Sequence, residues 1–374
     1  MRIESLRTVA FRNLRDCGFE PGPTVNILYG DNAQGKTNLL EAAWLFTGSR
    51  SFRGAADHEM IRIGSEKSAL AMNFIARNAP SEAKIDIQQR RSATLNGVSL
   101  ESAARLAGEF CCVIFSPEHL GLVKEGPQLR RKFLDAAICP LWPRHASNLF
   151  EYNRVLAQRN ALLKDVQNHS ELMDTLSVWD EKLAALGGKI IFTRLRYLAR
   201  LAPKAQEIYG GITQGKEPLK ITYRCGSGAQ YDCQLDSASE SQRVLYALLL
   251  EGHRSSLHQD MEVGWTHTGP HRDDLVIDIE DLSARLYGSQ GQQRSAVLAL
   301  KLAEASVLGQ ALSEAPVLLL DDVMSELDRS RQEYLLNHIG GWQVLITCCD
   351  PAGLEVLSDG RIFEVKKGAA TRIN

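Results

Sequence analysis

Zinc-type cysteine spacing is absent from this sequence. Its 374 residues include eight cysteines, which form no C-x-x-C pair and have no histidines at the spacing of a zinc site. Two adjacent pairs, Cys111–Cys112 and Cys348–Cys349, lie in apolar strand-like runs, where cysteine behaves as a small hydrophobic residue. We therefore expect buried, reduced thiols, which suit the cytoplasm.

A membrane-spanning run is also absent. No apolar stretch approaches the ~20 residues that cross a bilayer, and the N-terminal MRIESLRTVAF lacks the pattern of a secretion signal. The composition, 44% hydrophobic and 24% charged, is that of an ordinary soluble protein. A chain of this length predicts about two or three domains. We expect a cytoplasmic protein without membrane association.

A strong overall charge is the third absence, since the net charge is only −2. The distribution is uneven: Leu120 to Lys204 holds 14 basic and eight acidic residues, so this segment is +6 and the remainder of the chain is −8. Charge alone leaves two interpretations open. The segment is either a footprint for a polyanion or the solvated face of a group of helices.

The stretch VNILYGDNAQGKTNLLEAAWLF, residues 25–46, contains a phosphate-binding loop. An apolar strand-like run ends at Gly30, a helical pattern begins at Lys36, and G-x-x-x-x-G-K-T lies between them. Backbone N–H groups of such a loop surround an anion, Lys36 neutralises the β- and γ-phosphates, and the Thr37 hydroxyl binds Mg²⁺. The predicted nucleotide contacts are Gly30, Asp31, Asn32, Ala33, Gln34, Gly35, Lys36 and Thr37.

A second part of the site follows late in the chain, where the apolar run PVLLL ends in Asp321 and Asp322. This is the Walker B pattern. We expect Asp321 to hold the Mg²⁺ shell together with Thr37, and Asp322 to orient or deprotonate the attacking water. Because adjacent strand residues point to opposite faces, the strand must end at the pair for both to reach the nucleotide.

Two further motifs flank this strand. A turn, Ser289-Gln-Gly291-Gln-Gln293, opens an Ala/Leu-rich helix and provides a second anion site from backbone amides, a hydroxyl and a helix dipole. Ser325-Glu-Leu-Asp328 follows the acids. A simple P-loop kinase uses neither motif. Both are explained if two copies face each other head to tail, each offering Ser289 to the γ-phosphate of the other.

The middle of the chain is helical. Apolar residues recur at three- and four-residue spacing over 149–166 and about every 3.5 residues over 172–201, which predicts an antiparallel helical hairpin roughly 30–45 Å long. Gly187-Gly188 is expected to loosen or kink it. Alternating strands are predicted before it, over 69–100, with a hairpin at Asn96-Gly97. A metal site at His267, His271 and Asp273 has no recognised ligand spacing in its favour.

Together these motifs resemble the ABC-type ATPases of the SMC-like class, and within that class the RecF family of DNA repair proteins. The resemblance covers essentially the whole chain and rests on LRTVAFRNLRD, GDNAQGKTNLLEA, SRSFRG, FSPEHLGLVKEGPQLRRKFLD, THTGPHRDDL, SQGQQRS, LLLDDVMSELD and VLITCCD. It implies an α/β ABC-type ATPase head, with a mixed sheet around the P-loop, an antiparallel β part and an inserted helical lobe with a short arm. The implied division is 1–118 and 311–374 for lobe I, and 119–310 for lobe II with the arm and the signature motif.

The resemblance also implies a function in DNA replication and in recombinational repair of DNA damage, including the SOS response. ATP and Mg²⁺ are the implied cofactors. The implied partners are double-stranded DNA, single-strand/duplex junctions, an ATP-dependent second copy and a RecR-type mediator, in the bacterial cytoplasm. Such a protein binds ATP and then dimerises over duplex DNA near single-strand gaps. It hydrolyses ATP weakly, DNA stimulates this hydrolysis, and the protein helps to load recombinase.

Residue roles carry over onto matching positions. Ser289, Gly291 and Gln293 become the signature that contacts ATP in trans, Asp328 becomes the dimer-interface acid, and Arg130, Arg131 and Lys132 become candidate DNA contacts. Most ABC ATPases have Glu where this chain has Asp322, so we expect slow hydrolysis. At the strand end Thr347-Cys-Cys-Asp350 the switch-loop histidine of transporters is missing, and Thr347 is expected to contact the γ-phosphate region. The turn at residues 116–118 stands where a Q-loop is expected.

Three other function classes share parts of this pattern. A nuclease of the overcoming-lysogenisation type joins a similar head to a metal-dependent domain, for which the roughly 50 residues after the Walker B strand leave no room. A small-molecule P-loop kinase does not explain Ser289–Gln293 or the helical arm. An SMC-like ATPase of another DNA-processing complex remains the nearest alternative.

Overall fold

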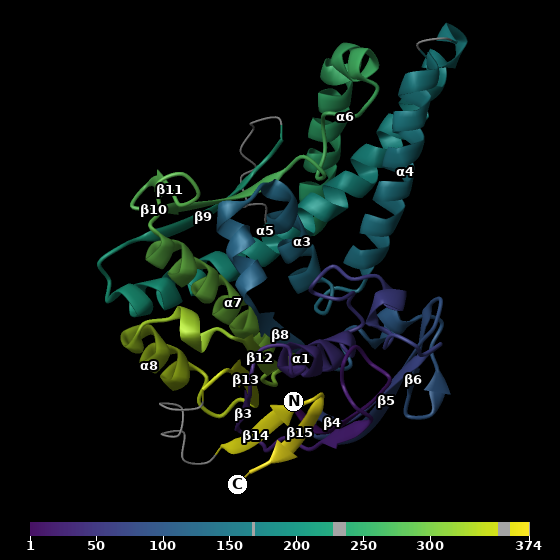
Figure 1. The fold of residues 1–374 in the computed structure, drawn as a ribbon. Coiled ribbons are helices and arrows are strands. Elements are labelled where there is room, and N and C mark those ends of the chain that lie inside the picture. Colours follow the sequence, from purple (N-terminus) through teal and green to yellow (C-terminus); the bar gives the residue numbers. More distant parts are fainter. Residues whose placement is uncertain (167–168, 227–236, 351–359, 374) are drawn as a thin grey trace. The chain divides into compact units, whose positions relative to one another are not determined.

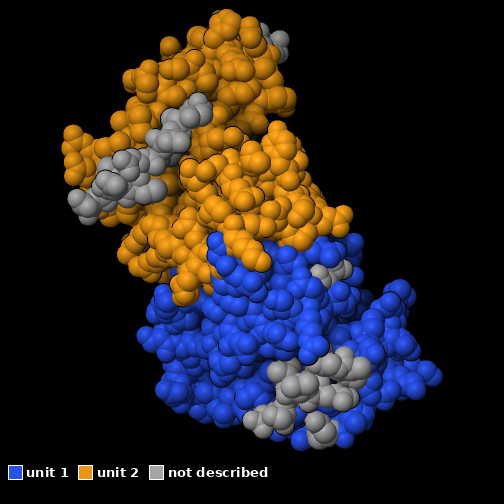
Figure 2. Space-filling model, turned by 90° about the vertical axis from the view of Figure 1, so that its left-hand side faces the viewer, with its two compact units in different colours: residues 1–120, 211–215, 294–374 blue, residues 121–210, 216–293 orange. Residues whose placement is uncertain are grey.

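The chain divides into two compact units in a computed structural model, which describes residues 1–166, 169–226, 237–350 and 360–373 (Figure 1). Unit 1 comprises Met1–Leu120, Gly211–Gly215 and Arg294–Asn374, and unit 2 comprises Gly121–Gly210 and Lys216–Gln293 (Figure 2). This division groups residues 294–310 with unit 1, whereas the sequence-based division ends lobe II at 310. The assignment of these parts as lobe I and lobe II of an ATPase stays a prediction.

Unit 1 contains the P-loop sheet, whose strand order is β15-β14-β3-β13-β12-β8. Strands β14, β3, β13, β12 and β8 run parallel to one another, and β15 pairs antiparallel with β14. The parallel strands are short apolar runs buried on both faces, as parallel strands generally are. The strands are β3 (Val25–Tyr29), β8 (Cys112–Phe115), β12 (Val317–Asp321), β13 (Val344–Cys348), β14 (Arg361–Lys366) and β15 (Ala369–Arg372).

The predicted antiparallel strands form a second six-stranded sheet in unit 1, with the order β2-β1-β4-β5-β6-β7. Asn96 and Gly97 both have positive φ and join β6 to β7, as the hairpin signal indicated. Within the described residues these strands pair with one another and with no strand of the P-loop sheet, so the antiparallel β part implied by the resemblance is a sheet of its own. The strands are β1 (Arg2–Val9), β2 (Cys17–Phe19), β4 (Ser68–Ala76), β5 (Ala79–Ile87), β6 (Arg91–Leu95) and β7 (Val98–Ser99).

One hydrophobic core joins both sheets of unit 1. Helix α1 (Lys36–Leu45) contributes Leu39, Leu40 and Ala43 to it, as its apolar pattern predicted. Helix α8 (Arg329–His338) connects β12 to β13. The remaining short helices of unit 1 are η1 (Asp57–Met60), η2 (Ala103–Leu106), η3 (Pro117–Leu120) and η5 (Met324–Glu326).

Helix α7 (Gln290–Leu312) begins in unit 2 and continues into unit 1. Among the residues that the structure describes, it is the one helix long and apolar enough to cross a membrane, with a mean hydropathy of 1.3 over its best window. Because 78% of that window is buried within the protein, its apolar character is that of a core helix.

Unit 2 combines helices with a three-stranded antiparallel sheet of order β11-β10-β9. Its strands are β9 (Leu219–Arg224), β10 (Asp274–Ile279) and β11 (Leu282–Ser283). Its helices are α2 (Gly121–Lys124), α3 (Pro127–Ile138), α4 (Arg144–Val166), η4 (Ser170–Thr175), α5 (Leu176–Thr213) and α6 (Ala238–Val263).

The helical arm contains three helices, not the predicted two. Helices α4 and α5 pack antiparallel. Tyr152 and Val155 of α4 share a hydrophobic cluster with Leu183 and Ile190 of α5. Farther along α4, Leu163 packs in a second cluster with Leu176, the first residue of α5. The apolar residues Leu257 and Met261 bring α6 against the same end (Figure 1). The sequence showed the periodicity of each helix but not that a later helix covers the pair.

The two glycines of α5 are sites of close packing, and the expected kink stays a prediction. The helix continues unbroken from Leu176 to Thr213. A Cβ on Gly188 would lie 3.2 Å from the carbonyl oxygen of Gln242, and one on Gly187 would lie 2.8 Å from Leu249 Cδ1. Both neighbours belong to α6, so the glycines let two helix backbones approach.

Buried ion pairs join the elements of unit 2. The fully buried guanidinium of Arg159, on α4, lies 2.6 Å from Asp180 of α5 and 2.7 Å from Asp260 of α6. It also donates to Thr266 Oγ1 at 2.8 Å. A buried charge of this kind is tolerated only with such partners, so Arg159 fixes how the three arm helices meet.

We predict that Arg159→Met destabilises the protein by about 3–5 kcal/mol, because it leaves two buried carboxylates without their cation. Arg154→Met is the matched control: Arg154 lies on the same helix but is exposed and pairs with the acid Glu151 at the surface, so the change should cost less than about 1 kcal/mol. Urea-denaturation midpoints measure both. Equal shifts would contradict the structural role of Arg159.

Candidate functional site

The loop from Gly30 to Gly35 crosses from β3 to α1 on two glycines with positive φ, +149° and +110°. A Cβ on Gly30 would lie 2.4 Å from the carbonyl oxygen of Val365, and one on Gly35 would lie 2.8 Å from Leu14 Cδ2. Only glycine fits both the conformation and the space. Helix α1 begins directly after this turn, so its N-terminal amides face the loop.

The ammonium group of Lys36 closes the loop. It donates hydrogen bonds to the carbonyl oxygens of Gly30 and Asp31, the latter at 3.0 Å, and lies 3.8 Å from Cys349 Sγ. The cation is thus held over the same turn of backbone that would surround an anion. This is the place where the P-loop lysine is needed.

Residues from outside the motif fix the far side of the loop. Asn13 Nδ2 donates to the carbonyl oxygen of Ala33 at 2.7 Å. The backbone N–H groups of Gly368 and Lys367 donate to the carbonyl and the side-chain oxygen of Gln34, at 3.0 and 2.6 Å. Sequence reasoning missed Asn13 and the β14–β15 turn, because both contacts join distant segments.

The acidic pair lies at the carboxyl end of β12, as predicted. Thr37 Oγ1 donates to Asp321 Oδ1 at 2.8 Å, which joins the phosphate loop to the acidic strand. Thr347, at the end of β13, donates to the same oxygen at 2.8 Å and accepts from the backbone N–H of Asp322 at 2.9 Å. Asp322 itself has φ +51°, which turns the chain at the strand end.

Burial raises the pKa of Asp321 above its ordinary value, and the hydrogen bonds from Thr347 and Thr37 oppose this. The neighbouring carboxylates of Glu118 and Asp322 raise the pKa further. Glu118 follows strand β8, so the Q-loop position holds an acid close enough to influence Asp321. A hydroxyl and carboxylates gathered in this way suit a hard cation such as Mg²⁺.

A cavity of about 660 Å³ lies at the phosphate loop and the acidic strand end. The predicted residues that line it are Asn32, Ala33, Gln34, Gly35, Lys36, Thr37, Asp321 and Asp322, together with Thr347. Arginines that the sequence analysis did not select also line it, namely Arg12, Arg53 and Arg62. Arg12 is paired with the buried Glu41, and Arg62 with Asp16. The volume is that of a typical small-ligand site.

The signature turn lies in unit 2 and caps helix α7. Ser289 Oγ accepts from the N–H of Gln292 at 3.2 Å, and Gln292 Oε1 accepts from the N–H of Ser289 at 2.8 Å, a reciprocal capping box. Ser289 is exposed. Gln293 corrects the prediction: its side chain is buried and donates to the carbonyl oxygen of Ala284 at 2.9 Å, so its amide braces the turn instead of facing outward.

Asp328 begins helix α8. Its Oδ1 accepts from the backbone N–H of Arg331 at 3.0 Å, and its Oδ2 pairs with the Arg331 guanidinium. The carboxylate is exposed. It is therefore an N-cap within one chain, and its predicted role at a dimer interface stays a prediction.

The candidate DNA contacts differ in exposure. Arg130 is buried and forms a two-bond ion pair with Asp274, at 2.7 and 3.0 Å, while also donating to two carbonyl groups. This corrects its assignment as a DNA contact, because its donors are used inside unit 2. Arg131 is half-buried and donates to the carbonyl oxygen of Asp273. Lys132 is exposed and remains a candidate.

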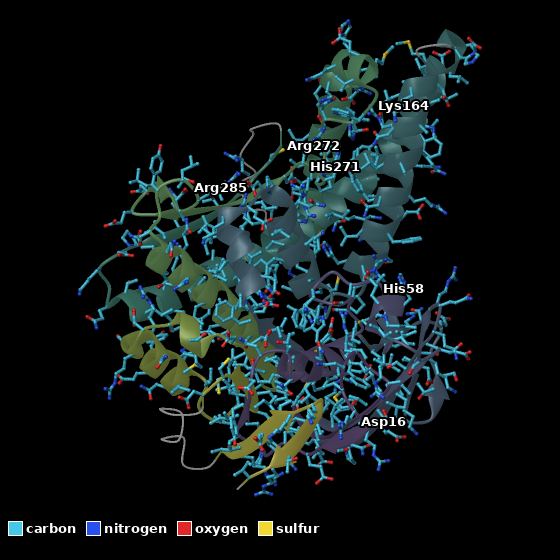
Figure 3. The ribbon with its side chains drawn as sticks, viewed as in Figure 1. Asp16, His58, Lys164, His271, Arg272 and Arg285 are labelled. Atoms are coloured by element: carbon cyan, nitrogen blue, oxygen red, sulfur yellow. The ribbon has the colours of Figure 1, made fainter. Side chains whose placement is uncertain are left out.

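The histidines of THTGPHRDDL bond to protein groups. His267 Nδ1 lies 2.8 Å from Asp260 Oδ1, and His271 Nδ1 lies 2.8 Å from the Tyr152 hydroxyl. Figure 3 labels His271 and Arg272 of this motif. Asp273 accepts from the Tyr223 hydroxyl at 2.6 Å. Over the described part of the chain, no group of three His, Cys, Asp or Glu side chains is placed to hold a metal. The motif therefore forms hydrogen bonds that connect several elements of unit 2.

Comparison with known proteins decides the family. No family model matches the chain. The DNA replication and repair protein RecF of Agathobacter rectalis is 38% identical over 377 residues, covering 98% of each chain. The chain belongs to the RecF family.

Solved structures agree with this assignment. A structure of the recombination mediator protein RecF with ATP, in the RecFOR pathway, is 34% identical, with a TM-score of 0.90 and coverage of 100% of this chain and 97% of that one. The Smc head domain of Pyrococcus furiosus, bound there to the C-terminal domain of ScpA, has a TM-score of 0.55 at 14% identity, covering 99% and 95% of the two chains. The ABC-type ATPase head predicted from the sequence is therefore confirmed as the fold.

For this member of the RecF family, we predict that Gly30→Ala lowers stability by at least about 2 kcal/mol, because a Cβ there meets a backbone oxygen in a left-handed conformation. Gly97→Ala is the control. Gly97 also has positive φ, +80°, but open space around it, so about 1 kcal/mol is expected. Urea midpoints distinguish the two, and indistinguishable losses would refute the steric argument.

Proposed function

We propose that this chain is an ATP-driven recombination mediator of DNA repair that uses hydrolysis as a conformational switch. The observation that carries the proposal is the bond between Thr37 and Asp321 inside a cavity lined by the phosphate loop. That bond brings together the two halves of a Mg-nucleotide site from residues 284 positions apart. The family relationship and the RecF structure with ATP support the same nucleotide.

The predicted residues of the nucleotide site then have separate tasks. The loop amides of Gly30–Thr37 and the start of α1 bind the phosphates, and Lys36 exchanges its contacts to loop carbonyls for contacts to the β- and γ-phosphates. Thr37 and Asp321 would hold Mg²⁺, which neutralises the charge that develops on the phosphates. Asp322 orients the attacking water and accepts its proton.

The trans half of the site is the second part of the proposal. Ser289 is exposed at the start of α7, beside Gly291, and would cover the γ-phosphate of a second copy, with Asp328 near the same interface. ATP bound by two protomers at once links nucleotide state to dimer state. Asp322 is one methylene shorter than the Glu of most ABC ATPases, so hydrolysis should be slow, as suits a switch.

DNA and a protein partner complete the proposal. The dimer would close over duplex DNA near single-strand gaps, with exposed basic residues such as Lys132 on phosphates, which makes binding weakly sequence-selective and sensitive to salt. The recombination mediator and RecFOR pathway named for the relative support a RecR-type partner and the loading of recombinase. The proposed location is the bacterial cytoplasm. Family membership sets the kinase and nuclease alternatives aside.

We predict that Lys36→Met abolishes measurable ATP turnover, because the phosphate charge is no longer neutralised.

Ser289→Arg should retain binding of ATP by the monomer but lose the ATP-dependent dimer and DNA-stimulated turnover. Turnover assays and mass measurement with and without duplex DNA test both.

Ser237→Arg is the control for Ser289→Arg, since Ser237 is also a helix N-cap in unit 2 and its loss reproduces the cost in stability alone. The control should dimerise normally. A Ser289→Arg protein that still dimerises with ATP would contradict the trans site.

We predict that Lys132→Ala weakens duplex binding equally for different sequences and reduces the slope of log affinity against log salt by about 1. Lys84→Ala, an exposed lysine of β5, is the control and should leave the slope unchanged. Fluorescence anisotropy over a salt series measures the slopes. A lower slope for Lys84→Ala and not for Lys132→Ala would place the DNA elsewhere.

A further inference from the structure

Thr347 occupies a central place in the P-loop sheet. Strand β13 lies between β3 and β12, and Thr347 is paired in register with Leu28 on one side and with Asp321 on the other. Its side chain is 1% exposed, yet it lines the cavity at the carboxyl end of these strands. The residue therefore stands between the strand that leads into the phosphate loop and the strand that ends in the acids.

The hydroxyl group of Thr347 makes two hydrogen bonds of opposite direction. It donates to Asp321 Oδ1 at 2.8 Å and accepts from the backbone N–H of Asp322 at 2.9 Å. A backbone N–H can only donate, so the single hydroxyl proton is available for the carboxylate of Asp321. One side-chain atom thus holds both acids of the site.

The bond to Asp321 fixes which carboxylate oxygen is available. Oδ1 receives two hydroxyl protons, from Thr37 and Thr347, at 2.8 Å each. Within the described residues Oδ2 has no hydrogen bond, so this oxygen is left for a cation or its water. A carboxylate held on one oxygen by two donors cannot rotate without breaking both bonds.

The bond to Asp322 fixes the turn that follows. Asp322 has φ +51°, an unfavourable conformation for a residue with a Cβ. Its N–H is held by Thr347, and Ser325 Oγ donates to its carbonyl oxygen at 2.8 Å and to its Oδ1 at 3.1 Å. The N–H bond is what ties this strained residue to the neighbouring strand.

We infer that Thr347 is a positioning residue for ATP hydrolysis, which sets the metal-facing oxygen of Asp321 and the backbone of Asp322 at the same time. The inference rests on the proposed ATPase function. It replaces the sequence-based expectation that Thr347 contacts the γ-phosphate, because its only proton is donated to Asp321.

The test uses the full chain with wild type, Thr347→Val and Thr347→Ser. Removal of the hydroxyl by Val should lower kcat about 10–100-fold, since small misplacement of catalytic groups has effects of this size. It should leave KM for ATP within about twofold and raise the Mg²⁺ concentration for half-maximal turnover several-fold. Ser, which retains the hydroxyl, should restore most of the rate.

Two controls separate positioning from stability. Thr8→Val removes a buried strand hydroxyl in the same unit, bonded to the carbonyl oxygen of Arg15, and should leave kcat and the Mg²⁺ dependence unchanged. Thermal midpoints are recorded for every variant. If Thr347→Val does not fold, Thr347→Ala and Thr347→Ser replace it, because these two differ only by the hydroxyl oxygen.

Several results would overturn the inference. Turnover at the wild-type rate and Mg²⁺ dependence in Thr347→Val, or equal turnover by the Ala and Ser variants, would show that the hydroxyl is not needed. Loss of ATP affinity in EDTA by Thr347→Val would show a direct phosphate contact instead. A wild-type protein that neither binds nor hydrolyses ATP would refute the proposed function itself, which is a different outcome.

Discussion

The carboxylate of Asp321 is the group on which the nucleotide site depends. It is buried at the end of β12, and hydroxyl groups from α1 and β13 hold one of its oxygens. Burial disfavours the charged form and raises its pKa, while the two hydroxyls compensate in part. The charged carboxylate is costly at this buried position, and a cation at the proposed Mg²⁺ site would offset that cost.

The second unit uses buried charge for another purpose. Three of its arginines are buried with carboxylates: Arg130 with Asp274, Arg159 with Asp180 and Asp260, and Arg194 with Asp135. These pairs fix the orientation of helices around the sheet and the arm. They also explain why the basic segment 120–204 is a weak indicator of DNA binding, since three of its arginines are buried in ion pairs within unit 2.

The RecF-family motifs therefore divide into two kinds. GDNAQGKTNLLEA and LLLDDVMSELD place functional groups in the cavity, whereas THTGPHRDDL holds unit 2 together through Asp273, Asp274 and its histidines. FSPEHLGLVKEGPQLRRKFLD contributes to both, because Glu118 influences Asp321 while Arg130 is a structural residue. The resemblance assigned roles to residues of the phosphate loop, the acidic strand end and Arg130–Lys132, but none to THTGPHRDDL.

The sequence by itself determined the phosphate loop, the acidic strand end, the antiparallel hairpin at Asn96-Gly97 and the family. Each of these is a local signal, because a loop conformation, a strand end or a turn depends on residues that are adjacent in the chain. Only the tertiary structure decided that Arg130 and Gln293 face inward, that α6 joins the arm, and that Thr347 holds both acids. Those facts depend on contacts between distant segments, such as the 144 residues that separate Arg130 from Asp274. No local pattern encodes which partner a buried charge or hydroxyl will find.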